Sequence, residues 1–204
     1  MLIKLRYKLT ATIVVFLCLC FSYYFVQRIY PGTLNLITDL DRNIPFVGVF
    51  VWPYISLFPV LALTFIFLVK RYYVFMTAML SCIIATAIAL YMYMLFPSSY
   101  MLRPDIITGD ISSYMCALVY THDLPNNSFP SLHVAYALII YCILGISVYG
   151  HILWLKIAYL VWMLMVIAST LLIKQHHIID VFCGMIVGYM SFLISKRLCN
   201  AKKP

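Results

Sequence analysis

Residues 72–96 read YYVFMTAMLSCIIATAIALYMYMLF, an apolar run that contains no charged side chain. A helix needs about 20 predominantly apolar residues, each rising ~1.5 Å, to cross the hydrocarbon core of a bilayer. This run is long enough to cross, and it is the longest of six such runs. The sequence therefore predicts an all-α, integral membrane bundle of six helices. The other five predicted spans cover residues 9–27, 46–69, 131–149, 152–173 and 178–195.

The composition of the chain also indicates a membrane protein. Of its 204 residues, 65% are hydrophobic and 10% are charged, against about 25% charged residues in an ordinary globular domain. Six crossings with short connections use most of this length, so we expect a single transmembrane domain over residues 1–204. The N-terminal apolar run ends in aromatic residues without a small-residue cleavage site, so we interpret it as a first membrane anchor rather than a signal peptide.

The charged residues divide between the two predicted faces of the membrane. All six acidic residues, each an aspartate, fall on the face opposite the N-terminus. The N-terminal face carries basic residues only, as the positive-inside rule requires of the cytoplasmic side, so we expect both termini in the cytoplasm. These basic residues are Lys4, Arg6, Lys8, Lys70, Arg71, Lys196, Arg197, Lys202 and Lys203.

The pattern of charges and cysteines argues against a nucleic-acid partner and against a zinc site or a disulfide framework. The net charge of +8 comes from the ends of apolar segments rather than from one basic surface, so no nucleic-acid partner is expected. Most of the seven cysteines lie inside apolar runs, and none has the spacing of a zinc site or of a disulfide framework. We therefore expect neither a metal ion nor a cofactor.

The strongest local pattern is KQHHIID at residues 174–180, where the fifth and sixth spans meet. His176 and Asp180 are four residues apart, so on a helix the carboxylate can accept a hydrogen bond from one imidazole nitrogen and leave the other free to attack. A carboxylate at the mouth of an apolar helix is costly in a bilayer unless it is paired. Two alternatives stay open: His177, three residues from Asp180, competes for the carboxylate, or the pair only caps the helix.

A second histidine and an arginine fall on the same predicted face. The run FPSLHVA at residues 129–135 starts the fourth span, and a helix start with Ser131 and His133 presents free backbone amides and a positive dipole end to a phosphate. Arg103 offers a planar charged fork that suits phosphate oxygens. Taken singly, His133 is also compatible with a solvated interfacial residue, and Arg103 with an anchor to lipid headgroups.

The order of these motifs resembles the three signatures of the type-2 phosphatidic acid phosphatase superfamily, six-helix membrane enzymes that act on lipid phosphates. The motifs are RP at 103–104, PSLH at 130–133, and the stretch 169–180 that contains His176 and Asp180. The closer resemblance is to the inositol phosphorylceramide synthase-like phosphotransferases, because Leu replaces Gly in the second signature and Gln precedes the histidine of the third. The run DRNIPF at 41–46, with Pro53 and Tyr54 beyond it, is also similar to a segment of that branch, and the resemblance extends from about Asp39 onward.

The chain departs from the broad family pattern at two cations. Phe96 stands where the first signature has Lys, and Thr170 stands where the third has Arg. Arg103 is left as the main cation for a phosphate, with Lys174 as a candidate substitute. These losses favour the phosphotransferase-like branch and leave open an enzyme of altered or reduced activity.

The resemblance implies a metal-independent mechanism on a lipid phosphate in the bilayer, at the non-cytoplasmic face. His176 attacks phosphorus and becomes phospho-histidine, Asp180 orients it, and His133 protonates the leaving group and then activates the acceptor. Arg103, Lys174 and the amides around Ser131 hold the phosphate. Water as acceptor makes the protein a phosphatase, and a lipid hydroxyl of the ceramide or diacylglycerol type makes it a transferase.

Two functions of other classes are less compatible with the sequence. A transporter places ionisable groups near the midplane of the bilayer, whereas Lys156 lies near the cytoplasmic end of its predicted span and Asp180 lies at the outer end of the last one. A non-catalytic scaffold would explain the missing cations but not the presence of both histidines and the aspartate. The outer segment 106–128 carries no readable motif, and we expect it to form a lid or an element lying on the membrane.

Overall fold

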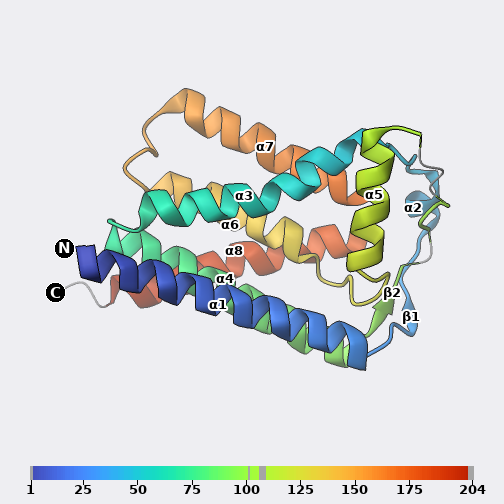
Figure 1. The fold of residues 1–204 in the computed structure, drawn as a ribbon, viewed down its shortest axis with the longest axis horizontal. Coiled ribbons are helices and arrows are strands. Elements are labelled where there is room, and N and C mark those ends of the chain that lie inside the picture. Colours follow the sequence, from blue (N-terminus) through green and yellow to red (C-terminus); the bar gives the residue numbers. More distant parts are fainter. Residues whose placement is uncertain (1, 101, 106–108, 202–204) are drawn as a thin grey trace.

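Six long helices lie side by side in the computed structural model, which describes residues 2–100, 102–105 and 109–201. A shorter helix, α5 (Ile111–His122), crosses one end of this bundle, and both chain termini lie at the other end (Figure 1). The all-α prediction is confirmed for the bundle. The long helices are α1 (Leu2–Ile29), α3 (Val51–Leu68), α4 (Tyr72–Leu95), α6 (Leu132–Ile146), α7 (Leu153–Leu172) and α8 (Ile178–Asn200).

Five of these helices are long and apolar enough to cross a membrane, so the chain has the character of a multi-pass membrane protein. The sixth, α6, has 15 residues and is shorter than the predicted span 131–149. It ends at Ile146 because Ser147 adopts an extended backbone, with ψ 171°, and its hydroxyl bonds the Leu144 carbonyl. Six crossings, and the cytoplasmic placement of both termini, therefore stay predictions.

The long connections at the α5 end carry small elements. A two-residue parallel pair joins β1 (Leu34–Asn35) to β2 (Ser98–Ser99), and two short helical segments, α2 (Asp39–Asn43) and η1 (Gly48–Phe50), precede α3. The predicted outer element 106–128 contains α5, which Asp110 caps by accepting a hydrogen bond from the Ser113 amide at 2.8 Å. Residues 106–108 of that prediction lie outside the described part of the chain.

Two glycines set the distance between α6 and α8. A Cβ atom on Gly184 would lie 2.6 Å from the carbonyl oxygen of Ser131, and one on Gly188 would lie 2.7 Å from that of Ala135. Only glycine fits at such positions, and its four-residue spacing on one helix face lets two backbones approach closely. The start of α6 is thereby held against the first turns of α8.

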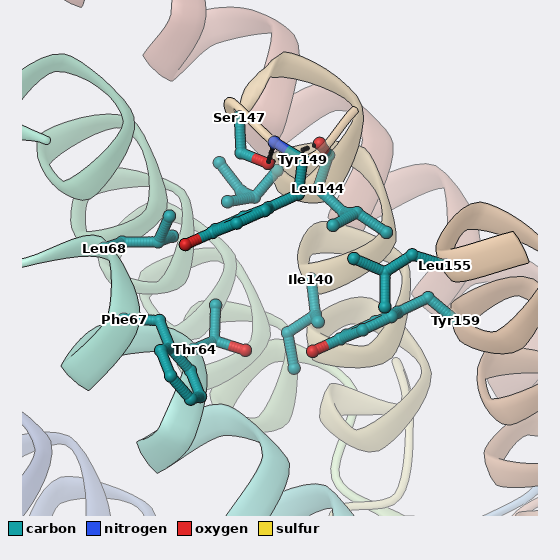
Figure 2. A pocket seen from close by; sticks show the side chains of 10 residues that line it. Thr64, Phe67, Leu68, Ile140, Leu144, Ser147, Tyr149, Leu155 and Tyr159 are labelled. Atoms are coloured by element: carbon teal, nitrogen blue, oxygen red, sulfur yellow. Dashed lines mark hydrogen bonds between the residues drawn. The ribbon is translucent and has the colours of Figure 1, made fainter. Parts of the chain in front are cut away.

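A cavity of about 290 Å³ lies between α3, α6 and α7, near the C-terminal end of α6 (Figure 2). Its walls are formed mainly by apolar side chains, including Phe67, Ile143 and Leu144, with the hydroxyl-bearing Tyr149 and Tyr159. Among the described residues, no histidine, acidic or basic side chain lines it. This cavity is therefore separate from the histidine-bearing start of α6 and has no cation to hold a phosphate.

Candidate functional site

The starts of α6 and α8 meet at one hydrogen bond. The Ser131 amide donates to the backbone carbonyl of Asp180 at 3.0 Å. This contact brings the ring centroids of His133 and His176 within 6.2 Å of each other. The structure thus places together the two histidines and the aspartate that the sequence singled out from segments more than forty residues apart.

At the start of α8, one carboxylate oxygen of Asp180 serves both neighbouring histidines. Asp180 Oδ2 accepts a hydrogen bond from the His177 amide at 2.9 Å and lies 3.2 Å from His177 Nδ1. The same oxygen lies 3.4 Å from His176 Nδ1. The four-residue spacing therefore brings His176 close to the carboxylate but without the expected hydrogen bond, and His177 has the shorter contact.

The two histidines differ in what surrounds them. The side chain of His177 is fully buried, and its ring packs against Tyr100 with centroids 4.4 Å apart. The ring of His176 instead lies beside that of His133, with centroids 6.2 Å apart, and its buried Nδ1 has no hydrogen-bond partner within the described ranges. This placement next to a second histidine and a carboxylate is compatible with a nucleophile, and that role stays a prediction.

Hydrogen bonds to the backbone carbonyl of Thr170 fix the segment that precedes α8. The Thr170 carbonyl accepts hydrogen bonds from the amides of Gln175 and His176 at 3.0 and 3.1 Å, while the backbone of Lys174 turns with φ 55°. A positive φ is uncommon for a residue with a side chain and is sustained only where surrounding contacts hold it. Thr170, the position at which the sequence lacks a cation, therefore shapes the loop through its main chain.

Asp41 in α2 caps the start of α8 from outside the helix. Its Oδ1 accepts a hydrogen bond from the Ile178 amide at 2.8 Å, and its Oδ2 accepts from the amide and hydroxyl of Thr38 at 2.8 and 2.6 Å. Burial alone would raise the pKa of Asp41, but these hydrogen bonds outweigh it and hold the pKa below its ordinary value. Asp41 is thus an anion that fixes the histidine-bearing segment.

Lys174, the candidate substitute cation, is held by the same segment. Its Nζ donates to the backbone carbonyl of Asp41 at 3.0 Å, and only 6% of the residue is exposed. Burial lowers the pKa of Lys174, and the nearby Asp41 opposes that effect. The structure shows no contact between Lys174 and either Arg103 or His176, so its role as a phosphate ligand stays a prediction.

At the start of α6, Ser131 acts as a helix cap. Its hydroxyl accepts a hydrogen bond from the Val134 amide at 3.4 Å, and its own amide is already bonded to α8. The sequence indicated this residue as part of a phosphate-binding helix start. The donors left at this end are the first-turn amides of Leu132 and His133, which have no acceptor within the helix.

Arg103 lies between α5 and the segment that precedes α8. Its Nη2 donates to the side-chain oxygen of Gln175, its Nη1 lies 3.4 Å from the Tyr120 carbonyl, and its guanidinium stacks over the Tyr120 ring at 4.6 Å. Burial lowers the pKa of Arg103. The ring hydroxyl of Tyr120 in turn donates to the Ile173 carbonyl at 2.6 Å, which ties α5 to the same segment.

Several buried nitrogen atoms around this site have no hydrogen-bond partner in the described part of the chain. A buried polar group without a partner costs stability, so its presence in a folded protein needs an explanation. Oxygen atoms of a bound phosphate would provide acceptors for such donors. The atoms are Arg103 Nε, His133 Nε2, Gln175 Nε2, His176 Nδ1 and His177 Nε2.

The sequence did not predict the roles of several residues at the site. Gln175 and Asp41 appeared in the sequence analysis only within a resemblance, although Gln175 binds Arg103 and Asp41 caps α8. Tyr54 likewise appeared only within that resemblance, and Asp123, which bonds the Tyr54 hydroxyl, gave no local pattern. Phe96, at the position where the family has Lys, ends α4 with 46% of its surface exposed.

A comparison with known families gives a match that covers the starts of α6 and α8. A family model described as the PAP2 superfamily matches residues 77–204, which include α6, α8 and Arg103. The segments that carry Asp41 and Tyr54 precede the matched region. No curated protein and no solved structure matches the chain significantly.

Proposed function

Because this chain belongs to the PAP2 superfamily, we propose that it cleaves a lipid phosphoester or pyrophosphate through a phospho-histidine intermediate. Members of this family are generally phosphatases or phosphotransferases. The observation that carries the proposal is the approach of His133 to His176, 6.2 Å between ring centroids, with Asp180 beside the second ring. We place the reaction at the non-cytoplasmic end of the bundle, on the predicted charge asymmetry.

The first step forms a bond between His176 Nε2 and phosphorus. The bond from phosphorus to the leaving oxygen breaks, its electron pair stays on that oxygen, and protonated His133 supplies the proton. The imidazole of His176 then carries positive charge, which the carboxylate of Asp180 stabilises near Nδ1. Neutral His133 is left in the correct state for the second step.

The second step reverses these roles. His133 takes a proton from the acceptor hydroxyl, the acceptor oxygen attacks phosphorus, and the electron pair of the nitrogen–phosphorus bond returns to His176 Nε2. His133 thus serves as the acid in the first step and as the base in the second.

The phosphate oxygens would face the donors that lack partners in the free protein. Arg103 Nε lies beside the Nη2 atom that binds Gln175, so the guanidinium and the Gln175 amide form one donor surface. First-turn amides of α6 and the positive end of its dipole add to this surface. Lys174 can join it only by exchanging its bond to the Asp41 carbonyl.

A second candidate function is transfer of the phosphoryl group to a lipid hydroxyl of the ceramide or diacylglycerol type. The specific observation that favours it is the pairing of Arg103 with Gln175, in a site without the two cations of the broad family pattern. That pairing agrees with the resemblance to inositol phosphorylceramide synthase-like enzymes. Hydrolysis and transfer differ only in the acceptor.

The experiment is an assay of purified protein in detergent micelles against a panel of lipid phosphates and pyrophosphates, with and without diacylglycerol or ceramide. Released phosphate reports hydrolysis, and a new phosphorylated lipid reports transfer. We expect turnover without added metal that His176→Ala abolishes. Turnover that survives this substitution, or none on the whole panel, would contradict the proposal.

A further inference from the structure

The ring of His133 is fixed without any hydrogen bond among the described residues. Its Nε2 is buried and unpaired, and no carboxylate contacts its ring, unlike the rings beside Asp180. What touches it is aromatic: Tyr54 stacks on it with centroids 4.0 Å apart and an interplanar angle of 19°, and Phe58 meets it edge-on at 5.7 Å. Two side chains of α3 therefore set the plane of this imidazole.

Tyr54 is itself held in place by a carboxylate. Its hydroxyl donates to Asp123 Oδ2 at 3.1 Å, and only 2% of the residue is exposed. The other oxygen of Asp123 accepts from the Tyr23 hydroxyl at 2.7 Å and from Gln27 Nε2 at 3.0 Å. Asp123 thus joins α1 and α3 at the end of the bundle where the site lies, and fixes one rotamer of Tyr54.

From this geometry we propose that Tyr54 is the positioning residue for His133, with Asp123 as the group that holds Tyr54. The proposal rests on the proposed function, since it assigns His133 the proton transfers of that reaction. A ring stack fixes the plane of an imidazole without occupying either nitrogen. A histidine that alternately gives and takes a proton needs this freedom, because a carboxylate on one nitrogen would favour a single protonation state.

If Tyr54 positions His133, the rate lost when Tyr54 is substituted should depend on the leaving group of the substrate. An alkyl oxygen leaves only with a proton from His133, whereas a p-nitrophenyl oxygen leaves as a stable anion. A misaligned His133 should therefore slow cleavage of an alkyl phosphate such as dioleoyl phosphatidic acid far more than cleavage of p-nitrophenyl phosphate. A loss of general stability would slow both substrates equally.

The test compares kcat/KM for these two substrates in three variants, because kcat/KM reports the first step and excludes the later attack of the acceptor, in which His133 also takes part. Tyr54→Leu removes the stack and should lower kcat/KM on the alkyl phosphate by about 10²-fold, within the range for one general acid. Tyr54→Phe keeps the ring but loses the bond to Asp123, and a smaller misplacement should cost about tenfold. The kcat/KM for p-nitrophenyl phosphate should stay within about twofold in both variants. Tyr136→Phe, which removes a bonded hydroxyl on α6, the helix that carries His133, should change neither value.

A second readout does not depend on turnover. Diethyl pyrocarbonate modifies neutral imidazole nitrogens, and mass spectrometry reports the extent at each histidine. Because Tyr54 covers one face of the His133 ring, Tyr54→Leu should raise its modification rate several-fold, while Tyr136→Phe should leave it unchanged.

The outcomes separate this proposal from the proposed function. An equal loss on both substrates in the Tyr54 variants, or an unchanged modification rate of His133 in Tyr54→Leu, would overturn the positioning role while the enzyme assignment stands. A wild-type protein that turns over neither substrate, yet shows the increased modification in Tyr54→Leu, would leave the stack supported and refute the proposed function.

Discussion

The starts of α6 and α8 present their histidines in two different ways. At α8, Asp180 lies within 3.4 Å of Nδ1 on both His176 and His177, and Asp41 caps the same turn. At α6, His133 makes no hydrogen bond with the described residues, and the rings of Tyr54 and Phe58 lie against it. The difference matches the chemistry that we assign: a nucleophile that becomes positively charged gains from a fixed carboxylate, whereas a residue that exchanges protons gains from orientation alone.

The largest effect should come from substituting, one at a time, the two histidines at the start of α8. His176→Ala removes the proposed nucleophile and should lower kcat by about 10⁴-fold or more, as loss of a nucleophile does elsewhere. His177→Ala should keep a substantial fraction of activity, because that ring is buried against Tyr100. The measurement is kcat on a lipid phosphate in micelles. An essential His177 with a dispensable His176 would reverse our assignment.

A second prediction breaks the contact between the two helix starts. In Gly184→Ala the new Cβ would lie 2.6 Å from the Ser131 carbonyl, so α6 must move away from α8. A displacement on the scale of 1 Å between reacting groups costs about 10²-fold in rate.

The matched control for this substitution is Gly145→Ala, in the last turn of α6. A Cβ atom there meets nothing within 4 Å, so full activity is expected. Equal activity of both variants would show that the close approach of the helices does not set the geometry of the site.

The third prediction concerns the donor surface between the two starts. Arg103→Lys keeps the charge but cannot donate in parallel to Gln175 and to a phosphate, so kcat/KM should fall by about tenfold. Micelles without anionic lipid remove any role in anchoring headgroups. A wild-type rate under those conditions would mean that Arg103 binds the membrane rather than the substrate.

The smallest effect should be a change in the free energy of unfolding when Asp41 is substituted. The pKa of Asp41 is lower in the folded protein than in the unfolded chain, so the unfolded state binds more protons in acid. The stabilisation by Asp41 is therefore complete above the unfolded pKa of about 4 and is lost as the pH falls through the folded value.

Asp41→Asn should lower stability by about 1 kcal/mol at neutral pH and flatten the acid decline of the melting temperature. Asp39→Asn, which removes an exposed carboxylate 4.0 Å from Arg42, should leave the curve unchanged. Identical acid profiles for Asp41→Asn and the wild type would contradict the capping role.

The sequence predicted the helices better than their ends. Apolar runs located all six long helices because burial in lipid requires such runs whatever the details of packing. The end of α6 at Ile146 depends on the backbone of Ser147, which hydropathy does not detect. The helix spacing of His176 and Asp180 likewise placed them near each other, but the spacing could not show that His177 would share the carboxylate.

Local sequence patterns did not predict the contacts of the residues that support the site. Asp123 and Tyr54 are separated by 69 positions and meet only through the folding of α3 against the α5 end of the bundle. Asp41 reaches α8 across 137 positions. Contacts of this separation depend on tertiary packing, so no spacing rule in the sequence predicts them.

The most direct test of the central claim is to trap the intermediate. Wild-type protein is mixed with a radiolabelled lipid phosphate, quenched in alkali and digested, and the labelled peptide is sequenced by mass spectrometry. The account predicts an acid-labile phosphoryl group on His176, with the label absent from His176→Ala and strongly reduced in His133→Ala, because the alkyl leaving group of a lipid phosphate needs the proton of His133. Label on His177, or rapid turnover with no labelled histidine, would contradict it.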